Sequence, residues 1–282
     1  MILDGKVLAV TGGSQGIGKA VAEEALKQGA RVVVNDVDAE LLGRTVDEMG
    51  SGEKIEAVPG DVSEMATARK IASAAVERFG RLDAIVNNAG VLRDRTFLKM
   101  SEDEWDLVIR VHLRGTFCCA KAAAEVMAEK GGGSIVNVTS TAGMKGNFGQ
   151  CNYSAAKSAI LGFTRTLSME LKKQNIRVNA IAPGAKTRMT LSIPEEVLMQ
   201  KAKDDPKYLK LLNLPGPECV APLVCFLASE KAVDINGMIF GIVGGELSLW
   251  RYPGQVKVMY TEGKWSDEQL EKAIPRLVEE LK

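Results

Sequence analysis

Three residues near the middle of the chain have the types and spacing that acid–base chemistry at a hydroxyl group requires. Tyr153 and Lys157 are four residues apart on an expected helix, so both side chains lie on one face. A phenol has a pKa of about 10, and a neighbouring cation favours its ionised form. Bringing that pKa to neutrality requires about 4 kcal/mol, which Lys157 and a second cation in a partly dry site can supply. Ser140 can hydrogen-bond the same substrate oxygen, so the trio predicts proton transfer at a substrate hydroxyl.

The elements that must position these residues follow from a repeated alternation of apolar runs and helical stretches. Ser140 comes directly after Ser134–Thr139, a short run of the kind expected for a strand buried on both faces. The other runs of this form are Lys6–Thr11, Arg31–Asp36, Ile55–Val58, Asp83–Asn87, Arg177–Ala182 and Met238–Ile242. The helical stretches include Gly16–Gln28, Ala39–Met49, Glu64–Phe79, Glu102–Glu129 and Asn152–Lys173. The pattern predicts an α/β fold with a doubly wound, mostly parallel sheet of about seven strands.

A glycine-rich segment connects the first expected strand to the first helix. Gly12, Gly16 and Gly18 stand where glycine lets the backbone turn tightly and lets a pyrophosphate approach closely. The start of the following helix presents free N–H groups and a positive dipole to that phosphate. The segment indicates a Rossmann-like fold and predicts dinucleotide contacts from these residues: Gly12, Ser14, Gln15, Gly16, Ile17 and Gly18.

The acidic residue that such a site requires is Asp36, at the end of the second strand and eighteen residues beyond Gly18. Its carboxylate can accept hydrogen bonds from the ribose hydroxyls of adenosine and would repel a 2′-phosphate. The neighbouring Asn35, Val37 and Gln15 carry no charge that could offset that repulsion. We therefore predict NAD(H) as the cofactor in preference to NADP(H).

Together with further motifs, these residues resemble the short-chain dehydrogenase/reductase superfamily over residues 2 to about 245. The motifs follow in order: Thr11-Gly12-x-x-x-Gly16-Ile17-Gly18, Asp61-Val62, Asn87-Asn88-Ala89-Gly90, Ser140, Tyr153-x-x-x-Lys157 and Pro183-Gly184. The resemblance implies that Asp61 and Val62 flank the adenine, and that Asn87–Gly90 supports the sheet and the cofactor. It also implies that Thr187 reaches the nicotinamide carboxamide. The full set of implied cofactor contacts beyond the glycine loop is Asp36, Asp61, Val62, Asn88, Ala89, Gly90, Tyr153, Lys157, Pro183, Gly184 and Thr187.

One position departs from the family pattern. Where the family usually has Asn on the helix before the catalytic strand, this chain has His112, its only histidine. The residue is either a hydrogen-bonded packing histidine or a fourth catalytic residue that holds a water near Lys157 for proton relay.

Three strings indicate a closer resemblance within the family, and they are Leu92–Arg95, Arg110–Gly115 and Gly146–Lys157. They resemble the (3R)-hydroxyacyl-CoA dehydrogenase unit of peroxisomal multifunctional enzyme type two and its bacterial relatives. This resemblance implies hydride transfer between NAD(H) and a 3-hydroxyacyl or 3-oxoacyl thioester, with CoA as carrier. A 3-oxoacyl-[acyl-carrier-protein] reductase shares the fold and catalytic residues but normally prefers NADPH. A dehydrogenase of hydroxysteroids or other secondary alcohols, and a non-catalytic NAD-binding module, are the remaining alternatives.

The expected substrate-binding segments are Thr141–Gln150 and a helical excursion at Thr187–Leu214, and basic residues in or directly beside them can meet a CoA phosphate. These residues are Lys145, Lys186 and Arg188. Residues 1–245 are expected to form one catalytic domain and residues 246–282 a C-terminal extension. In the extension, Ser266 and Gln269 resemble a helix capping box, and Pro275 is expected to kink or interrupt the apolar helix that follows. The family resemblance implies a homodimer or homotetramer.

Composition narrows the remaining classes of partner and site. The 36 basic residues equal the 36 acidic ones, which gives no reason to expect nucleic acid or an anionic membrane as partner. No run of roughly eighteen apolar residues predicts a membrane span. The five cysteines are odd in number and lack Cys-x-x-Cys spacing, so we expect free thiols and no metal site. The N-terminus lacks the build of a signal peptide, and we expect a cytoplasmic location.

Overall fold

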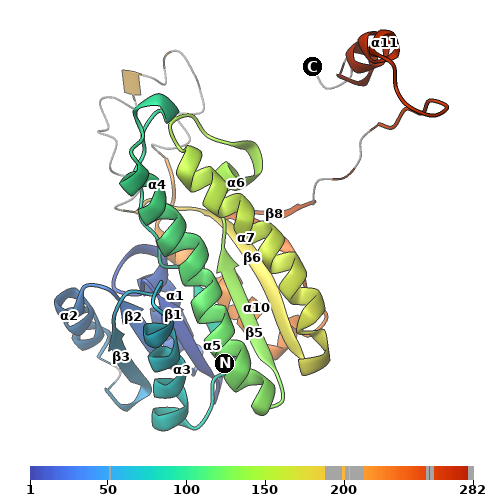
Figure 1. Cartoon of the computed structure of the whole chain (residues 1–282). Helices are drawn as coiled ribbons and strands as arrows, with labels where there is room; N and C mark the ends of the chain where they lie inside the picture. The colour runs from blue at the N-terminus through green and yellow to red at the C-terminus, as the bar shows by residue number, and fades with distance from the viewer. Residues whose placement is uncertain are drawn as a thin grey trace. The chain divides into compact units, whose positions relative to one another are not determined.

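The computed structural model describes residues 1–50, 52–187, 199–200, 203, 213–251, 254 and 257–278. These residues contain a single eight-stranded sheet in the order β3-β2-β1-β4-β5-β6-β7-β8 (Figure 1). Its strands are β1 Val7–Thr11, β2 Arg31–Asp36, β3 Ile55–Pro59, β4 Ala84–Asn87, β5 Gly133–Val138, β6 Ile176–Gly184, β7 Ile239–Val243 and β8 Glu246–Trp250. The first seven strands are parallel, and β8 pairs with β7 antiparallel. The predicted doubly wound parallel sheet is confirmed, with one added antiparallel strand.

Helices cover both faces of this sheet, as a parallel sheet requires. Among the described residues of the first compact unit, the α-helices described over their full length are α1 Gly16–Lys27, α2 Ala39–Met49, α3 Met65–Phe79, α4 Glu102–Ile109, α5 Gly115–Glu129, α6 Thr141–Lys145, α7 Cys151–Glu170 and α10 Ala221–Ala228. Short 3-10 turns lie at η1 Gly52–Lys54, η2 Phe97–Lys99, η4 Lys172–Gln174, η6 Pro217–Cys219 and η7 Glu230–Ala232. The single helix expected at Glu102–Glu129 is divided by a π-helical segment, η3 Arg110–Arg114, between α4 and α5.

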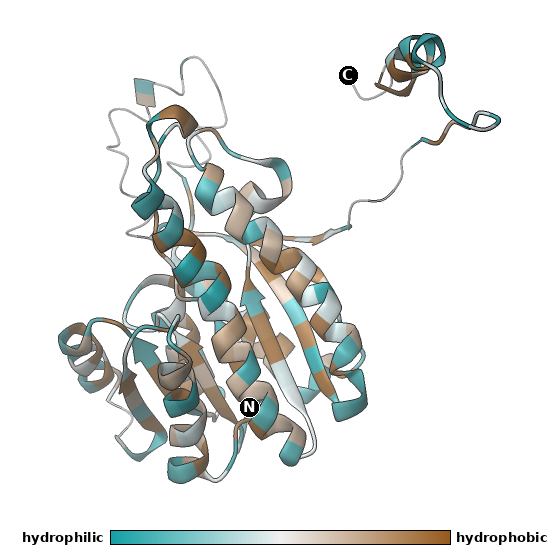
Figure 2. Cartoon of the chain, in the orientation of Figure 1, coloured by the Kyte–Doolittle hydropathy of each residue, from teal (hydrophilic) through white to brown (hydrophobic). Residues whose placement is uncertain are grey.

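Alternate residues of the central strands supply two hydrophobic cores, one on each face of the sheet. Along β1, Leu8 and Val10 join the cluster that includes α1 and α10, whereas Val7 and Ala9 join the cluster that includes α3 and α5. Because β1 is buried on both faces, its sequence is a continuous apolar run and not an alternating one. In Figure 2 the strands are largely brown, the colour of hydrophobic residues.

The chain forms two compact units, Met1–Trp250 and Arg251–Lys282. The first unit includes β8, which lies beyond the expected domain boundary at residue 245. In the second unit, α11 Asp267–Val278 begins at the predicted capping box: Ser266 Oγ accepts the Gln269 N–H, and Gln269 Oε1 accepts the Ser266 N–H. Of the two effects expected at Pro275, the interruption is wrong, because the helix continues to Val278, and the kink stays a prediction.

Four further expectations concern the helical excursion, membrane spans, the cysteines and metal sites. Most of the expected excursion Thr187–Leu214, including Arg188, lies outside the described residues. Within the described part, no helix is long and apolar enough to cross a membrane. All five cysteines are free thiols, and the described His, Cys, Asp and Glu side chains include no group of three placed to hold a metal ion.

Candidate active site

The predicted site residues gather at the carboxyl edge of the sheet. The glycine loop follows β1, the Asn88–Gly90 segment follows β4 and Ser140 lies just beyond β5. Pro183 and Gly184 form the end of β6. Carboxyl ends of parallel strands meet at one edge, where open α/β sheets bind ligands. The sheet order β1-β4-β5-β6 therefore brings residues from distant parts of the sequence together along one edge of the sheet.

The glycine loop requires glycine for backbone shape and for close packing. Gly12 and Gly16 have φ values of 62° and 56°, in the left-handed region that favours glycine. A Cβ on Gly18 would lie 2.2 Å from the Gly12 carbonyl oxygen, and a Cβ on Gly12 would lie 2.8 Å from Ala89 Cα. A Cβ on Gly16 would lie 3.5 Å from Thr187 Cγ2. Thr187, which the family resemblance assigns to the nicotinamide carboxamide, therefore lies against the glycine loop.

Three features of this loop fit a bound phosphate. Gln15, the N-cap residue of α1, makes no side-chain capping hydrogen bond, so this helix start keeps N–H groups that its own cap does not satisfy. Ser14 Oγ is buried and has no hydrogen-bond partner among the described residues. The Ile17 side chain packs against the hydrophobic core, and this packing anchors the loop between Gly16 and Gly18. Buried polar atoms are normally paired, so an unpaired hydroxyl beside a glycine loop indicates a ligand.

Asp36 ends β2 next to this loop. Its Oδ2 accepts the Ser14 N–H at 3.2 Å, which places the carboxylate beside the expected pyrophosphate site. At the end of the neighbouring strand, Asp61 Oδ1 accepts the Ser63 N–H and hydroxyl, and Asp61 Oδ2 pairs with Arg110 at 3.2 Å. Val62 is buried in the core on the α3 and α5 face. Asp61 thus binds a hydroxyl and a guanidinium of the protein, whereas Asp36 accepts two backbone N–H groups, those of Ser14 and Asp38 (3.4 Å), and forms no ion pair among the described residues. The second lone pair on each Asp36 oxygen can accept a ribose hydroxyl.

The segment after β4 is tied to the glycine loop. Asn88 Nδ2 donates to the carbonyl oxygens of Thr11 and Gly12 at 2.9 and 3.1 Å. The N–H groups of Asn88 and Ala89 both donate to Thr11 Oγ1. These bonds hold two loops from different strands as one rigid floor. At Gly90 an added Cβ would lie 2.3 Å from His112 Cε1, so Gly90 must be glycine for the histidine ring to pack there.

Ser140, Tyr153 and Lys157 converge at the far side of this floor. Ser140 Oγ accepts the Ala142 N–H at 3.1 Å, which caps α6, and also shares a hydrogen bond with the Tyr153 hydroxyl. Lys157 Nζ donates to the Val138 carbonyl oxygen at 2.7 Å and lies 5.6 Å from the centre of the Tyr153 ring. The predicted trio is therefore assembled from the end of β5 and the first turns of α7.

The electrostatics of the trio differ from the sequence-based expectation. Burial raises the pKa of Tyr153; the hydrogen bond from Ser140 opposes this, and the charge of Asp94 adds to it. Burial also lowers the pKa of Lys157 to about 7. The ammonium is bound to a backbone carbonyl and lies over the phenol ring. The protein alone therefore does not lower the phenol pKa, contrary to the simple lysine argument.

His112 lies within the π-helical segment, only 1% exposed, and its ring edge meets Tyr153 at a centroid distance of 5.2 Å. Its Nε2 is within hydrogen-bond distance of both the N–H and the carbonyl oxygen of Val91, and its Nδ1 has no partner among the described residues. Burial, and then the charge of Lys157, lowers the pKa of His112 to about 3. The imidazole is therefore neutral near pH 7. The backbone carbonyl oxygen of His112 accepts a hydrogen bond from the Thr116 hydroxyl.

The residues at the rim of the site are less closely gathered. Lys145 is exposed and lies 5.2 Å from the ring centre of Trp250, a cation–π contact. The Lys186 N–H donates to Pro215 O.

Two residues without a predicted role contribute directly to the site: Asp94, through its charge on Tyr153, and Asn152, which is fully buried beside Tyr153. Both stand inside the strings that suggested the closer resemblance, which is the only signal that could have pointed to them.

Comparisons with known proteins agree with this geometry. Residues 6–197 match the family model described as short chain dehydrogenase. The 3-oxoacyl-[acyl-carrier-protein] reductase FabG of Thermotoga maritima is 39% identical over 248 residues, which cover 87% of this chain and 99% of that protein. Hydroxyacyl-CoA dehydrogenase ChsB1 of Mycobacterium tuberculosis is 38% identical over 287 residues, covering 95% and 87%.

A multidomain relative and a solved structure extend the comparison. Peroxisomal multifunctional enzyme type 2 of Mus musculus is 37% identical over 256 residues; the match covers 88% of this chain and 33% of that protein. The crystal structure of a short chain dehydrogenase from Mycobacterium avium superposes with a TM-score of 0.87 at 34% identity, covering 99% of this chain and 96% of that one. The predicted resemblance is confirmed, and the chain is an enzyme of the short-chain dehydrogenase/reductase family.

Proposed function

We propose that this enzyme transfers hydride between NAD(H) and a 3-hydroxyacyl or 3-oxoacyl thioester carried on CoA. The choice of NAD(H) as cofactor rests on the position of Asp36, whose carboxylate is fixed beside the glycine loop by the Ser14 N–H. A carboxylate there accepts ribose hydroxyls and repels a 2′-phosphate. The family as a whole uses NAD or NADP, so Asp36 is the residue on which the choice rests.

The residues present fit a dinucleotide. The uncapped start of α1 and the unpaired Ser14 hydroxyl would hold the pyrophosphate, and Asp36 the ribose. Asn88, Ala89 and Gly90 would form the floor under the cofactor, and Thr187 would lie beside the nicotinamide end. When bound, NAD accepts or supplies the hydride, and its oxidised ring adds positive charge near Tyr153.

The protein's own residues handle the proton. The Tyr153 hydroxyl takes the proton from the substrate alcohol and returns it when a ketone is reduced. Ser140 hydrogen-bonds the same substrate oxygen and, through its bond to Tyr153, favours the phenolate. Lys157, with a pKa of about 7, changes protonation state near neutrality and can exchange a proton with its surroundings in each turnover. The neutral His112 ring packs against Tyr153 and limits its movement.

The substrate class rests on relatives of two kinds. FabG is named for a 3-oxoacyl group on acyl-carrier protein, and ChsB1 for a hydroxyacyl-CoA. Both names describe an acyl thioester with oxygen on the acyl chain, and this shared chemistry supports the proposal. The CoA carrier is preferred over acyl-carrier protein because the carrier-protein reductases normally prefer NADPH, which Asp36 disfavours. A dehydrogenase of hydroxysteroids or other secondary alcohols is the further alternative.

Two wider properties complete the proposal. We expect a homodimer or homotetramer, which the family resemblance supports and which light scattering on purified protein would test. We also expect a cytoplasmic location, supported by five free cysteines. A relative is named for the peroxisome, so imaging of the tagged protein in its own cell is the test of compartment.

The experiment that tests the function follows NADH absorbance with purified protein, a (3R)-hydroxyacyl-CoA and either NAD or NADP. We expect turnover with NAD and at least a tenfold lower kcat/KM with NADP, which corresponds to about 1.4 kcal/mol of discrimination. Asp36→Ala should narrow that difference without lowering kcat for NAD more than a few-fold. Activity only with NADP, or only on a carrier-protein thioester, would instead assign the reductase function.

A further inference from the structure

Asn152, the residue immediately before Tyr153, has an amide in which every polar atom is used. It lies in the first turn of α7 with no exposed side-chain surface. Its Nδ2 donates to the carbonyl oxygens of Arg93 and Glu104 at 2.9 and 3.1 Å. Its Oδ1 accepts the Tyr153 N–H at 2.7 Å. One amide therefore joins the loop after β4, helix α4 and the catalytic residue.

The loop held by this amide is the continuation of the cofactor floor. Asn88–Gly90 runs directly into the segment that carries Arg93, so the amide links the floor to the backbone of Tyr153. Two further contacts reinforce the connection: the Arg95 N–H donates to the Gly149 carbonyl, and Gln150 Nε2 donates to Asp94 Oδ2, both at 2.8 Å. Hydrogen bonds of Gly149, Gln150 and Asn152 thus fix the start of α7 against the loop that follows β4.

The chemistry of the site explains why an amide is needed here. Two carbonyl oxygens and one N–H converge on Asn152, so the side chain must donate twice and accept once, which neutral amides alone can do. An ionised carboxylate of the same shape has no donor and would place negative charge against both carbonyls. A buried carbonyl left without a donor is unfavourable, so the loop would move away.

We propose that Asn152 is a positioning residue that sets the distance from the Tyr153 hydroxyl to the hydride-transfer site. This inference rests on the proposed role of Tyr153. Displacing a reacting group by about 1 Å can reduce rate 100-fold, because the reacting atoms leave their productive geometry. The amide acts through the Tyr153 backbone and does not itself touch the substrate.

The test compares Asn152→Asp with the wild-type enzyme in the direction of ketone reduction, measuring kcat, KM and the Kd for NADH by fluorescence. We expect kcat to fall about 30- to 100-fold near pH 8, with the Kd for NADH changed less than threefold. As the pH falls and the introduced carboxyl protonates, one donor returns. The ratio of variant to wild-type kcat should therefore rise toward low pH, an ionisation that a general loss of packing would not produce.

Asn236→Asp is the matched control, because the Asn236 amide also donates to a carbonyl (Ser168 O) and accepts a backbone N–H (Val178). It lies at the amino edge of the sheet, so this variant should lose stability while its kcat remains near the wild-type value. An Asn152→Asp enzyme with kcat within threefold of wild type, or with kcat and NADH binding lost in parallel, would overturn the proposal.

Wild-type turnover on the CoA thioester tests the proposed function separately. If the wild-type enzyme does not act on it, an ultraviolet titration of Tyr153 still tests Asn152, with Tyr153→Phe as the reference for the other tyrosines. We then expect Asn152→Asp to shift the tyrosine titration relative to wild type, because the phenol changes position and gains a nearby charge. An unchanged titration would contradict the positioning role.

Discussion

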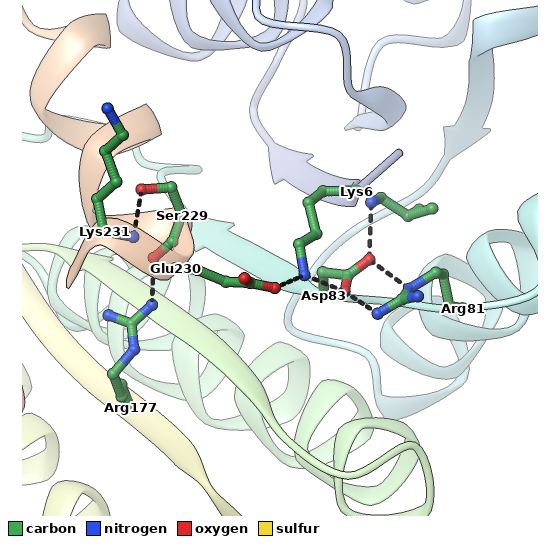
Figure 3. A network of polar contacts seen from close by, with 8 residues as sticks. Lys6, Arg81, Asp83, Arg177, Ser229, Glu230 and Lys231 are labelled. Carbon is green, nitrogen blue, oxygen red and sulfur yellow. Dashed lines mark hydrogen bonds and ion pairs between the residues drawn. The ribbon is translucent and has the colours of Figure 1, made fainter. Parts of the chain in front are cut away.

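The two edges of the sheet treat charge in opposite ways. At the amino edge, Asp83 accepts the Val7 N–H, holds Arg81 through both oxygens and lies 3.7 Å from Lys6, which pairs with Glu230 (Figure 3). At the carboxyl edge, no carboxylate among the described residues pairs with Lys157, and Ser14 Oγ and His112 Nδ1 are buried without partners. One edge satisfies its polar groups internally, whereas the other leaves several for a ligand.

The pKa values record the same difference. At the amino edge, the hydrogen bond and charge of Asp83 raise the pKa of Arg81. At the carboxyl edge, burial without a counter-ion lowers the pKa of Lys157 to about 7. Ionisable groups with perturbed pKa values and no internal partner are typical of functional sites, and paired ones are typical of structural networks. The comparison therefore predicts that variants at one edge change rate and variants at the other change stability.

The largest expected effect is the loss of rate in Tyr153→Phe. Removing the hydroxyl deletes the proton donor and acceptor but keeps the ring that packs on His112. We expect kcat to fall about 1000-fold or more, within the range for loss of an acid–base group. NADH binding, measured by fluorescence, and the midpoint of thermal unfolding should stay close to wild type. Substantial residual turnover would mean that another group carries the proton.

The next effect is a loss of stability in Asp83→Asn. The Asp83 side chain is only 10% exposed and accepts hydrogen bonds from Arg81 and from the Val7 N–H. Asparagine has a single acceptor oxygen, so the replacement loses charge-assisted hydrogen bonds and turns an amide donor toward Arg81 or Val7. We expect the free energy of unfolding to fall by about 2–3 kcal/mol, measured by urea denaturation. The kcat should be unchanged at a temperature where the variant is folded.

Glu230→Gln is the matched control for Asp83→Asn, because it removes a charge from the same network at an exposed position. Exposed ion pairs contribute little to stability. The urea midpoint of this variant should therefore remain close to wild type. If Glu230→Gln and Asp83→Asn lost equal stability, the network would depend on its total charge and not on the burial of Asp83.

How far the sequence predicted the molecule depended on whether the determining contacts were local. The strand at Arg31–Asp36 was predicted with its full bounds, because a doubly buried parallel strand is a continuous apolar run. The approach of the glycine loop to the ends of β4, β5 and β6 followed from the rule that parallel strands end at one edge. The residues of β8 were assigned to the C-terminal extension and no strand was predicted there, because Glu246–Trp250 is short and its pairing with β7 is a tertiary contact.

The electrostatics of the site could not be predicted in the same way. The expected effect of Lys157 on Tyr153 assumed that the ammonium faces the hydroxyl, whereas it donates to Val138 O. The role of Asn152 depends on carbonyls 59 and 48 residues away in sequence, which no local pattern brings together. His112, within the π-helical turn, likewise packs against Gly90 and Tyr153, which are distant in sequence and which no local pattern brings to it.

The smallest expected effect concerns His112, a residue near the carboxyl edge whose ionisation makes the free energy of unfolding depend on pH. Its pKa is about 3 in the folded protein and about 6.5 when unfolded, so the unfolded chain binds a proton between these values and the folded one does not. Stability is therefore lost as the pH falls below about 6.5. Between pH 7 and pH 5 this loss amounts to about 2 kcal/mol. In His112→Asn, urea denaturation should show that much less dependence on pH over the same interval, whatever the stability of the variant at pH 7. An unchanged slope would mean that the imidazole accepts a proton in the folded state and that His112 can serve as a proton carrier beside Tyr153.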